Sequence, residues 1–174
     1  MRRVFFAIWP PLAVSNALAE LASDAAPRCG GRQMRRETLH LTLAFIGNVE
    51  QDRIRDLEGA ADSLSAKACE LVLDEMAYWP RNRIVWCGTK HPPMELMSLA
   101  EQLGRALDDR GFKTDKRPFA VHVTVLRNAR CRDDGWGDPT PIVWPIREFV
   151  LVESNLKPEG ASYTILRGWP LAAG

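Results

Sequence analysis

The sequence has no hydrophobic run long enough to cross a membrane. Hydrophobic residues make up 46% of the 174 positions, yet no apolar stretch approaches the ~18 residues that a spanning helix needs. Residues 4–9 follow two arginines, as the core of a signal peptide would, but Pro10 and Pro11 end this run after six residues. We therefore interpret residues 4–9 as a core strand and expect no membrane contact.

An excess of charge of one sign is also missing. The 23 basic residues nearly balance the 22 acidic ones, which gives a net charge of +1. A protein that binds long nucleic acid along its surface needs a strongly basic face, so the charge excludes this class of protein. Binding of one or two phosphates remains compatible with it. The apolar fraction and the mixed charge exclude a disordered chain. The length predicts one domain over residues 1–174, or two small lobes that share a core, rather than a string of modules.

Cysteine is scarce. The four cysteines are Cys29, Cys69, Cys87 and Cys131, and no two of them form a CxxC pair, so a zinc ribbon or a thioredoxin-like site is not expected. A chain of this size does not need a disulfide framework, so we expect free thiols in a reducing compartment, the cytoplasm. No motif requires a resident cofactor, and we expect none.

The hydrophobic pattern predicts a mixed set of strands and helices. Alternation predicts strands at residues 4–9, 39–45, 71–78, 83–87, 121–126, 149–153 and 163–167. Helical spacing predicts helices at 12–23, 50–64 and 94–109, and turn-rich stretches predict loops at 27–36 and 130–141. Because strands and helices do not alternate strictly, we predict an α+β fold with two largely antiparallel sheets and flanking helices.

Two of the predicted strands repeat one pattern. Residues 39–43 read Leu-His-Leu-Thr-Leu and residues 121–125 read Val-His-Val-Thr-Val, so that His40 and His122 stand 82 positions apart, close to half the chain. A repeat at this distance predicts two similar lobes that face each other about a pseudo-two-fold axis. The sequence holds only three histidines, so two His-x-Thr motifs in matching strands are unexpected by chance.

Strand geometry gives the repeat a chemical meaning. Side chains at i and i+2 share a face, so His40 and Thr42 lie opposite the leucines, and His122 and Thr124 lie opposite the valines. If the lobes pack together, the two His/Thr pairs meet across a cleft. A lone strand histidine is usually an ordinary core or surface residue, but the doubled motif favours a catalytic site.

Two imidazoles and two hydroxyls suit the in-line hydrolysis of a phosphodiester. The pKa of imidazole is near ~6.5, so one ring can take a proton from water while the other gives one to the leaving oxygen. The threonine hydroxyls can donate to the non-bridging phosphoryl oxygens. A metal site needs at least three converging His, Cys or carboxylate ligands, and threonine is a poor one, so we expect no metal.

Arg127, five positions after His122, is a candidate cation for the phosphate or the RNA end. Strict alternation would put Arg127 on the face of Val125, so this role requires the strand to end or to bulge near Leu126. Upstream of the first motif, Arg32, Arg35 and Arg36 form either a basic rim or a solvated loop, and we interpret them as the loop.

The remaining histidine and several aromatic residues have ordinary interpretations. His91 lies between a threonine-lysine pair and two prolines, outside any motif, and is expected in a surface loop. Four aromatic residues could stack on a base, but the core is the expected place for all except Tyr78, which lies near a turn. These residues are Phe5, Phe6, Tyr78 and Trp86.

With its paired motifs, the chain resembles the 2H phosphoesterase superfamily. It is most similar to the bacterial and archaeal RNA 2′,3′-cyclic phosphodiesterases, also called 2′-5′ RNA ligases. The resemblance runs through nearly the whole chain, at residues 4–10, 39–47 and 122–127, then at 153–154, 163 and 169–171. It implies a bilobal α+β fold with the active site between the lobes.

The resemblance also implies roles for the motif residues. His40 would donate a proton to the leaving group, His122 would activate water, and Thr42 and Thr124 would bind the phosphoryl oxygens. The reaction would open a 2′,3′-cyclic phosphate at an RNA end, such as a tRNA fragment, to a 2′-phosphomonoester. A nucleotide is a further candidate ligand for the cleft. A monomer is expected because no apolar stripe is left unexplained.

One departure from the family concerns the positions before the second motif. The family often has a basic residue and then a proline there, whereas this chain has Ala120 and Val121. The apolar face of the strand is preserved, but a substrate contact is lost, so RNA affinity or preference is expected to differ.

Other functions fit the same residues. One is reversible 2′-5′ RNA ligation, and another is hydrolysis of a small cyclic nucleotide or an ADP-ribose cyclic phosphate. A different class is a non-catalytic module that binds RNA ends. Two titratable groups at the matched positions count against the last class, since binding alone does not need them.

Overall fold

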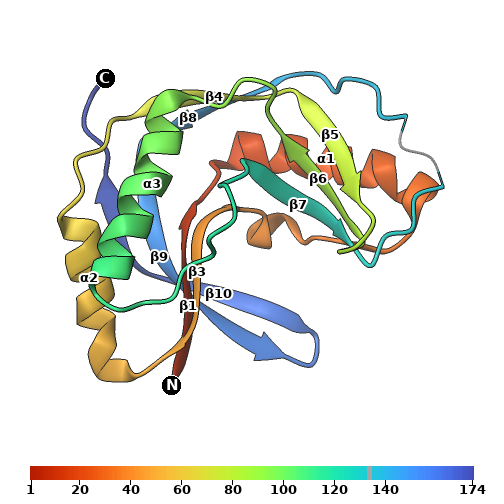
Figure 1. The fold of residues 1–174 in the computed structure, drawn as a ribbon. Coiled ribbons are helices and arrows are strands. Elements are labelled where there is room, and N and C mark those ends of the chain that lie inside the picture. Colours follow the sequence, from red (N-terminus) through yellow and green to blue (C-terminus); the bar gives the residue numbers. More distant parts are fainter. Residues whose placement is uncertain (133–134) are drawn as a thin grey trace.

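The computed structural model describes residues 1–132 and 135–174 (Figure 1). The helices are α1 (Leu12–Cys29), α2 (Ile54–Asp62) and α3 (Met94–Asp109), with 3₁₀ turns η1 (Arg36–Thr38) and η2 (Gln51–Arg53). The strands are β1 (Arg2–Ile8), β2 (Arg32–Gln33), β3 (Leu41–Val49), β4 (Cys69–Leu73), β5 (Glu75–Trp79), β6 (Ile84–Gly88), β7 (His122–Arg127), β8 (Ile142–Ile146), β9 (Glu148–Lys157) and β10 (Gly160–Pro170). The α+β prediction is confirmed.

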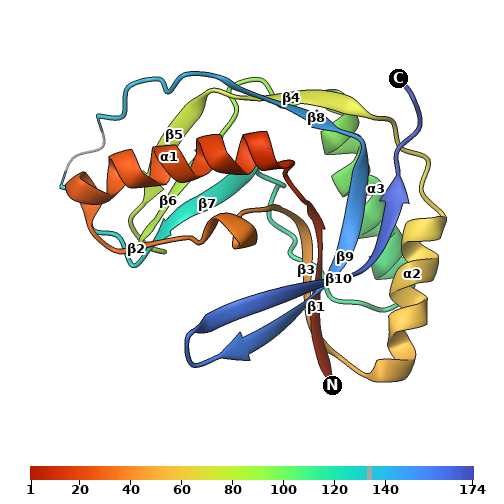
Figure 2. The ribbon, with the colours of Figure 1, turned by 180° about the vertical axis from the view of Figure 1, so that it is seen from behind.

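The main sheet consists of two halves that meet at one residue pair. Its strand order is β10-β9-β1-β3-β7-β6-β5, with β2 beside β7, and all these strand pairs are antiparallel. Only Leu41 and Val123 pair across β3 and β7. Helix α1 covers the half that holds β7, while α2 and α3 lie beside the half that holds β1 and β3 (Figures 1 and 2). A second sheet pairs β4 with β8.

One hydrophobic core extends through both halves. The alternating leucines of the first motif and the valines of the second belong to it, as do the apolar faces of all three helices. Burial of these side chains, at about 25 cal/mol per Å² of apolar surface, drives the two halves together. The core therefore lies behind the strand face that carries the histidines.

The predicted elements are correct in kind but not in every boundary. The strand predicted at 71–78 is two strands in different sheets, because β4 pairs with β8 and the chain turns at Asp74 before β5. Strand β8 was not predicted. It is short and contains Pro145, which suits a strand that pairs on one side only. The loop predicted at 130–141 has no helix or strand in its described part, and residues 133 and 134 lie outside the description.

Helix α1 extends to Cys29, six residues beyond its predicted end. The added turns bury Ala25 and Cys29, and this burial outweighs the missing amide hydrogen of Pro27. Part of the loop predicted at 27–36 is thus helix, and another part is the two-residue strand β2, which pairs with the end of β7.

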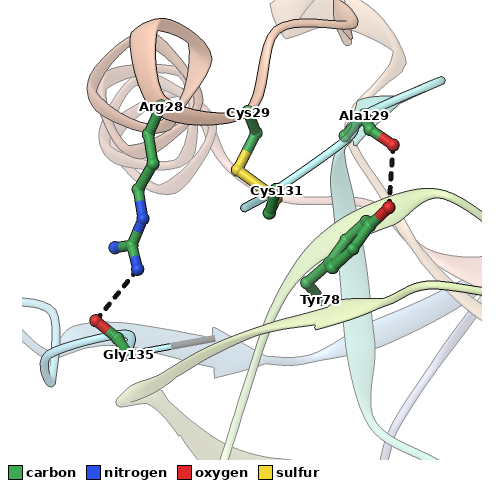
Figure 3. Close-up of a disulfide and its surroundings, with 6 residues drawn as sticks. All are labelled: Arg28, Cys29, Tyr78, Ala129, Cys131 and Gly135. Atoms are coloured by element: carbon green, nitrogen blue, oxygen red, sulfur yellow. Dashed lines mark hydrogen bonds between the residues drawn. A yellow bond between two sulfur atoms is a disulfide. The ribbon is translucent and has the colours of Figure 1, made fainter. Parts of the chain in front are cut away.

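A disulfide joins Cys29 to Cys131 (Figure 3), which corrects the prediction of free thiols at these two positions. The two cysteines are 102 positions apart, so only the packing of α1 against the segment after β7 brings them together. The Arg130 amide donates to the Cys29 carbonyl at 2.9 Å beside the bridge. Cys69 and Cys87 are free, as predicted.

Within residues 1–132 and 135–174, no helix is both long enough and apolar enough to span a membrane.

Candidate active site

The two His-x-Thr motifs lie side by side where the halves of the sheet meet. Leu41 and Val123 are direct partners across β3 and β7, so His40 and Thr42 flank one partner while His122 and Thr124 flank the other. The apolar residues of both motifs are buried, and the histidines and threonines are partly exposed on the opposite face. The faces expected from alternation are therefore the observed ones.

All four motif residues line one cleft of about 920 Å³ between the halves of the sheet. Helix α3, residues 114–120 and the turn between β5 and β6 also line this cleft. The volume suits a nucleotide-sized ligand. The structure thus brings the predicted residues together in one concave site.

Each histidine ring is held by the same backbone contact. His40 Nδ1 lies 2.7 Å from the carbonyl oxygen of Thr38, and His122 Nδ1 lies 2.9 Å from that of Ala120. A carbonyl only accepts, so Nδ1 must carry the hydrogen and donate it. In the neutral ring, Nε2 is then the proton acceptor. Both rings can therefore exchange protons with a ligand through Nε2.

Burial lowers the pKa of both imidazoles. Burial of the His40 ring lowers its pKa to about 4. The positive charges of Arg127 and His122 lower this pKa further, whereas the hydrogen bond to the Thr38 backbone opposes the shift. For His122, burial again lowers the pKa, the bond to Ala120 opposes it, and Arg127 contributes. Both rings are thus neutral near pH 7 when the cleft holds no anion.

Aromatic side chains account for this burial. The ring of His40 stacks on Trp9, with centroids 5.1 Å apart and planes 4° apart, and it also meets Phe5 and Tyr163. The ring of His122 meets Trp79 edge-on at 4.8 Å. Sequence reasoning missed Trp9 and Trp79. Alternation along the first strand was a usable signal for Trp9, since it shares a face with Phe5 at i and i+4.

Arg127 lines the same cleft as the histidines because β7 contains a bulge. Val85 pairs with Leu126 and Trp86 pairs with Thr124, so Val125 is the extra residue. Val125 and Leu126 are therefore both buried in succession, and Arg127 returns to the histidine face. The irregularity that a role for Arg127 requires is present.

The other candidates from the sequence lie elsewhere. Phe5 and Phe6 are buried as expected, and the Tyr78 hydroxyl donates to the Ala129 carbonyl at 2.9 Å rather than facing the cleft. Trp86 packs beside His122 without lining the cleft, and His91 is in an exposed loop. The aromatic residues that do line the cleft are Phe45, Trp79 and Phe119.

In the described part of the chain, no three His, Cys, Asp or Glu side chains form a group that could hold a metal ion. The lining of the cleft includes the two motif imidazoles, the hydroxyls of Thr42 and Thr124 and the guanidinium of Arg127. These groups provide a proton acceptor, a proton donor and hydrogen-bond donors for an anion, which is the set needed for acid–base cleavage of a phosphoester.

Comparison with known proteins shows the family of this chain. Residues 8–86 match the family described as LigT like Phosphoesterase. The RNA 2′,3′-cyclic phosphodiesterase of Escherichia coli K12 is 32% identical over 173 residues, which cover 98% of this chain and 97% of that protein. Solved structures of E. coli LigT with 3′-AMP and with ATP are similar, with TM-scores of 0.88 and 0.85, identities of 31% and 30%, and 98% coverage of both chains. The chain belongs to the LigT-like family of 2H phosphoesterases.

Proposed function

We propose that residues 1–174 act as one bilobal enzyme that hydrolyses RNA 2′,3′-cyclic phosphate ends to 2′-phosphomonoesters. His122 Nε2 takes a proton from water, whose oxygen attacks the phosphorus. His40 gives its Nε2 proton to the 3′ oxygen as the bond from phosphorus to that oxygen breaks. Thr42, Thr124 and Arg127 hold the non-bridging oxygens. No metal takes part.

The observation that carries this proposal is the placement of the two motifs. His40 and His122 flank the one residue pair that joins β3 to β7, and both line the same cleft with their Nδ1 atoms occupied by backbone carbonyls. The Nε2 atoms of both rings are the only ones left for the substrate. We choose an RNA cyclic phosphate as the substrate because the relatives are named for it. The assignment of His40 as acid and His122 as base follows the family resemblance.

A mononucleoside cyclic phosphate is a second candidate substrate. It is favoured by the similar E. coli protein, whose structure was solved with the mononucleotide 3′-AMP. Phe45 and Trp79, which line the cleft, offer aromatic faces on which one base can stack. Because E. coli LigT was also solved with ATP, we propose that this cleft accepts nucleotides as well as RNA ends, tRNA fragments among them.

Gel filtration and cell fractionation test our further expectation of a cytoplasmic monomer.

The decisive experiment uses a short RNA that ends in a 2′,3′-cyclic phosphate, incubated with the purified protein and EDTA. We expect complete conversion to the 2′-phosphate, identified by ³¹P NMR against both phosphate isomers. The same preparation of His122→Ala controls for contaminating nucleases. Activity that EDTA abolishes and added metal restores, or a 3′-phosphate product, would contradict the proposal.

A further inference from the structure

Three arginines surround a small pocket that opens beside the catalytic cleft. Arg32 and Arg35 line this pocket together with Arg127, which also lines the cleft. Thr38 and Met34 are shared by the two cavities as well, so they are contiguous. The pocket has a volume of about 60 Å³, enough for a group no larger than a phosphate.

Strand pairing forces two of these cations together. Arg32 of β2 is the direct partner of Arg127 of β7, so the two side chains emerge on the same side of the sheet. Like charges directly opposite each other destabilise a strand pair. Among the ion pairs of the described residues, none involves any of the three arginines. An anion between them would relieve the repulsion.

Two of the three guanidinium groups, those of Arg32 and Arg35, lie against the β9–β10 hairpin. This hairpin projects from the sheet on the side where β2 lies (Figure 2). Arg35 Nη2 donates to the carbonyl oxygen of Ala161 at 2.7 Å. Arg32 Nη1 lies 3.6 Å from the position that a Cβ atom would occupy at Gly160, in the turn between β9 and β10. The sequence alone indicated a solvated loop at Arg32 and Arg35. In the structure, both arginines and Ala161 of the hairpin line the small pocket.

We propose that this pocket is a second phosphate subsite, which binds the phosphate on the 5′ side of the terminal nucleoside. The inference rests on the proposed function, since the cyclic phosphate must occupy the histidine cleft for a second phosphate to reach Arg32. Arg127 lies between the two sites and contacts both anions. A guanidinium binds a phosphate oxygen through two parallel N–H groups, which favours arginine here. The consequence is a preference for substrates that carry a 5′ phosphate group.

The test compares three substrates in steady-state kinetics. They are adenosine 2′,3′-cyclic phosphate, the same nucleoside with an added 5′-phosphate, and the dinucleotide ApA ending in a cyclic phosphate. We expect the two substrates with a 5′-side phosphate to show a KM at least about tenfold below that of the first, as loss of a charge-assisted hydrogen bond implies. Arg32→Ala should raise their KM about tenfold and change the KM of the first substrate less than about twofold.

Two further variants separate charge from position. Arg32→Lys keeps the charge without the paired N–H groups and should recover part of the loss. Arg55→Ala removes one exposed charge from α2, outside both cavities, and should change no KM. Equal effects of Arg32→Ala on all three substrates, or a dinucleotide preference that survives this substitution, would overturn the subsite.

Equilibrium binding keeps the inference testable if the proposed function fails. Should the wild-type protein cleave none of the three substrates, the proposed hydrolysis is wrong. Titration with ApA 3′-phosphate and with adenosine 3′-phosphate then tests the pocket alone. Tighter binding of the dinucleotide that Arg32→Ala abolishes supports the subsite, and equal binding of both ligands overturns it.

Discussion

His40 and His122 share one local geometry but have different neighbours. Each ring donates through Nδ1 to the carbonyl two residues before it, so both present Nε2 to the cleft. Trp9, Phe5 and Tyr163 shield His40, and its pKa falls to about 4. A lowered pKa suits His122, the proposed base, because this ring must be neutral at pH 7. His40, the proposed acid, must be protonated, so it depends on the negative charge of the bound phosphate to raise its pKa.

Removing either imidazole should abolish turnover without unfolding the protein. For His40→Ala and His122→Ala we expect kcat to fall by ~10²- to 10⁴-fold, the usual contribution of a positioned acid or base. His40→Asn and His122→Asn keep a polar side chain if the alanine variants lose stability. Circular dichroism checks the fold, and His91→Ala, in an exposed loop, should retain the wild-type rate. A variant at either motif with near wild-type kcat would rule out the two-histidine mechanism.

The pH dependence of the rate should reflect the lowered pKa values. The reactive form holds one neutral and one protonated imidazole, so kcat/KM follows a bell set by the pair in the free enzyme. Both pKa values lie below the usual ~6.5, so kcat/KM should fall with rising pH above about 6.5. The bound phosphate anion raises both pKa values, so the alkaline limb of kcat should lie at higher pH.

Initial rates between pH 4 and 9 measure both profiles. His91→Ala should shift neither the acidic nor the alkaline limb of the two pH profiles, because His91 does not line the cleft. An alkaline limb of kcat/KM above about pH 7.5 in the wild-type enzyme would contradict the lowered pKa values.

Among the elements, the short strand β2 determines which arginines reach the site. It can pair with β7 only because the chain passes very close to it at Gly31, where φ is +84°. A Cβ at this position would lie 2.5 Å from the carbonyl oxygen of Arg127 and 2.9 Å from the amide nitrogen of Ala129. Both are backbone atoms, so they cannot move aside as a flexible side chain would.

Gly31→Ala should therefore separate β2 from β7. We expect a loss of at least about 2 kcal/mol in the free energy of unfolding, from the left-handed backbone and the backbone clash together. Urea denaturation measures it. Gly104→Ala is the matched control, because Gly104 lies in α3 and its added methyl group would meet no atom within 4 Å apart from the neighbouring backbone of the helix itself. This substitution should stabilise the protein by about 1 kcal/mol. Equal effects of the two changes would contradict the close approach at Gly31.

At the scale of the whole molecule, the disulfide ties the end of α1 to the segment that follows β7. It closes a loop of about a hundred residues between Cys29 and Cys131. Cross-linking so long a segment restricts the unfolded chain, for which a stabilisation of about 2–4 kcal/mol is typical. The bridge also lies next to Gly30 and Gly31, so it supports the pairing of β2 with β7.

Reduction of this bridge should lower the stability of the protein. We expect dithiothreitol to reduce the free energy of unfolding by about 2–4 kcal/mol, and the double variant Cys29→Ser, Cys131→Ser to match the reduced wild type. Dithiothreitol should have no effect on the double variant. Cys69→Ser, which leaves the bridge intact, should keep the full response. A wild-type protein whose urea midpoint is insensitive to dithiothreitol would contradict the pairing.

Locally encoded elements were predictable from the sequence. Helix α3 has its predicted bounds because two prolines precede Met94 and Gly111 follows shortly after its end. The β5–β6 hairpin follows from the turn-rich residues 79–82. In contrast, the break at Asp74 depends on β8, which lies about seventy residues further along the chain and could not be inferred from local pattern.

The sequence by itself determined the chemistry of the site and the strand face that carries it. Alternation along Leu-His-Leu-Thr-Leu and Val-His-Val-Thr-Val is a property of neighbouring residues, so it survives in any fold that keeps these strands. Tertiary structure decided which groups meet. The Leu41–Val123 pair, the stacking of Trp9 on His40 and the Cys29–Cys131 bridge all join residues far apart in the chain. Such contacts depend on how the whole core packs, which no local pattern specifies.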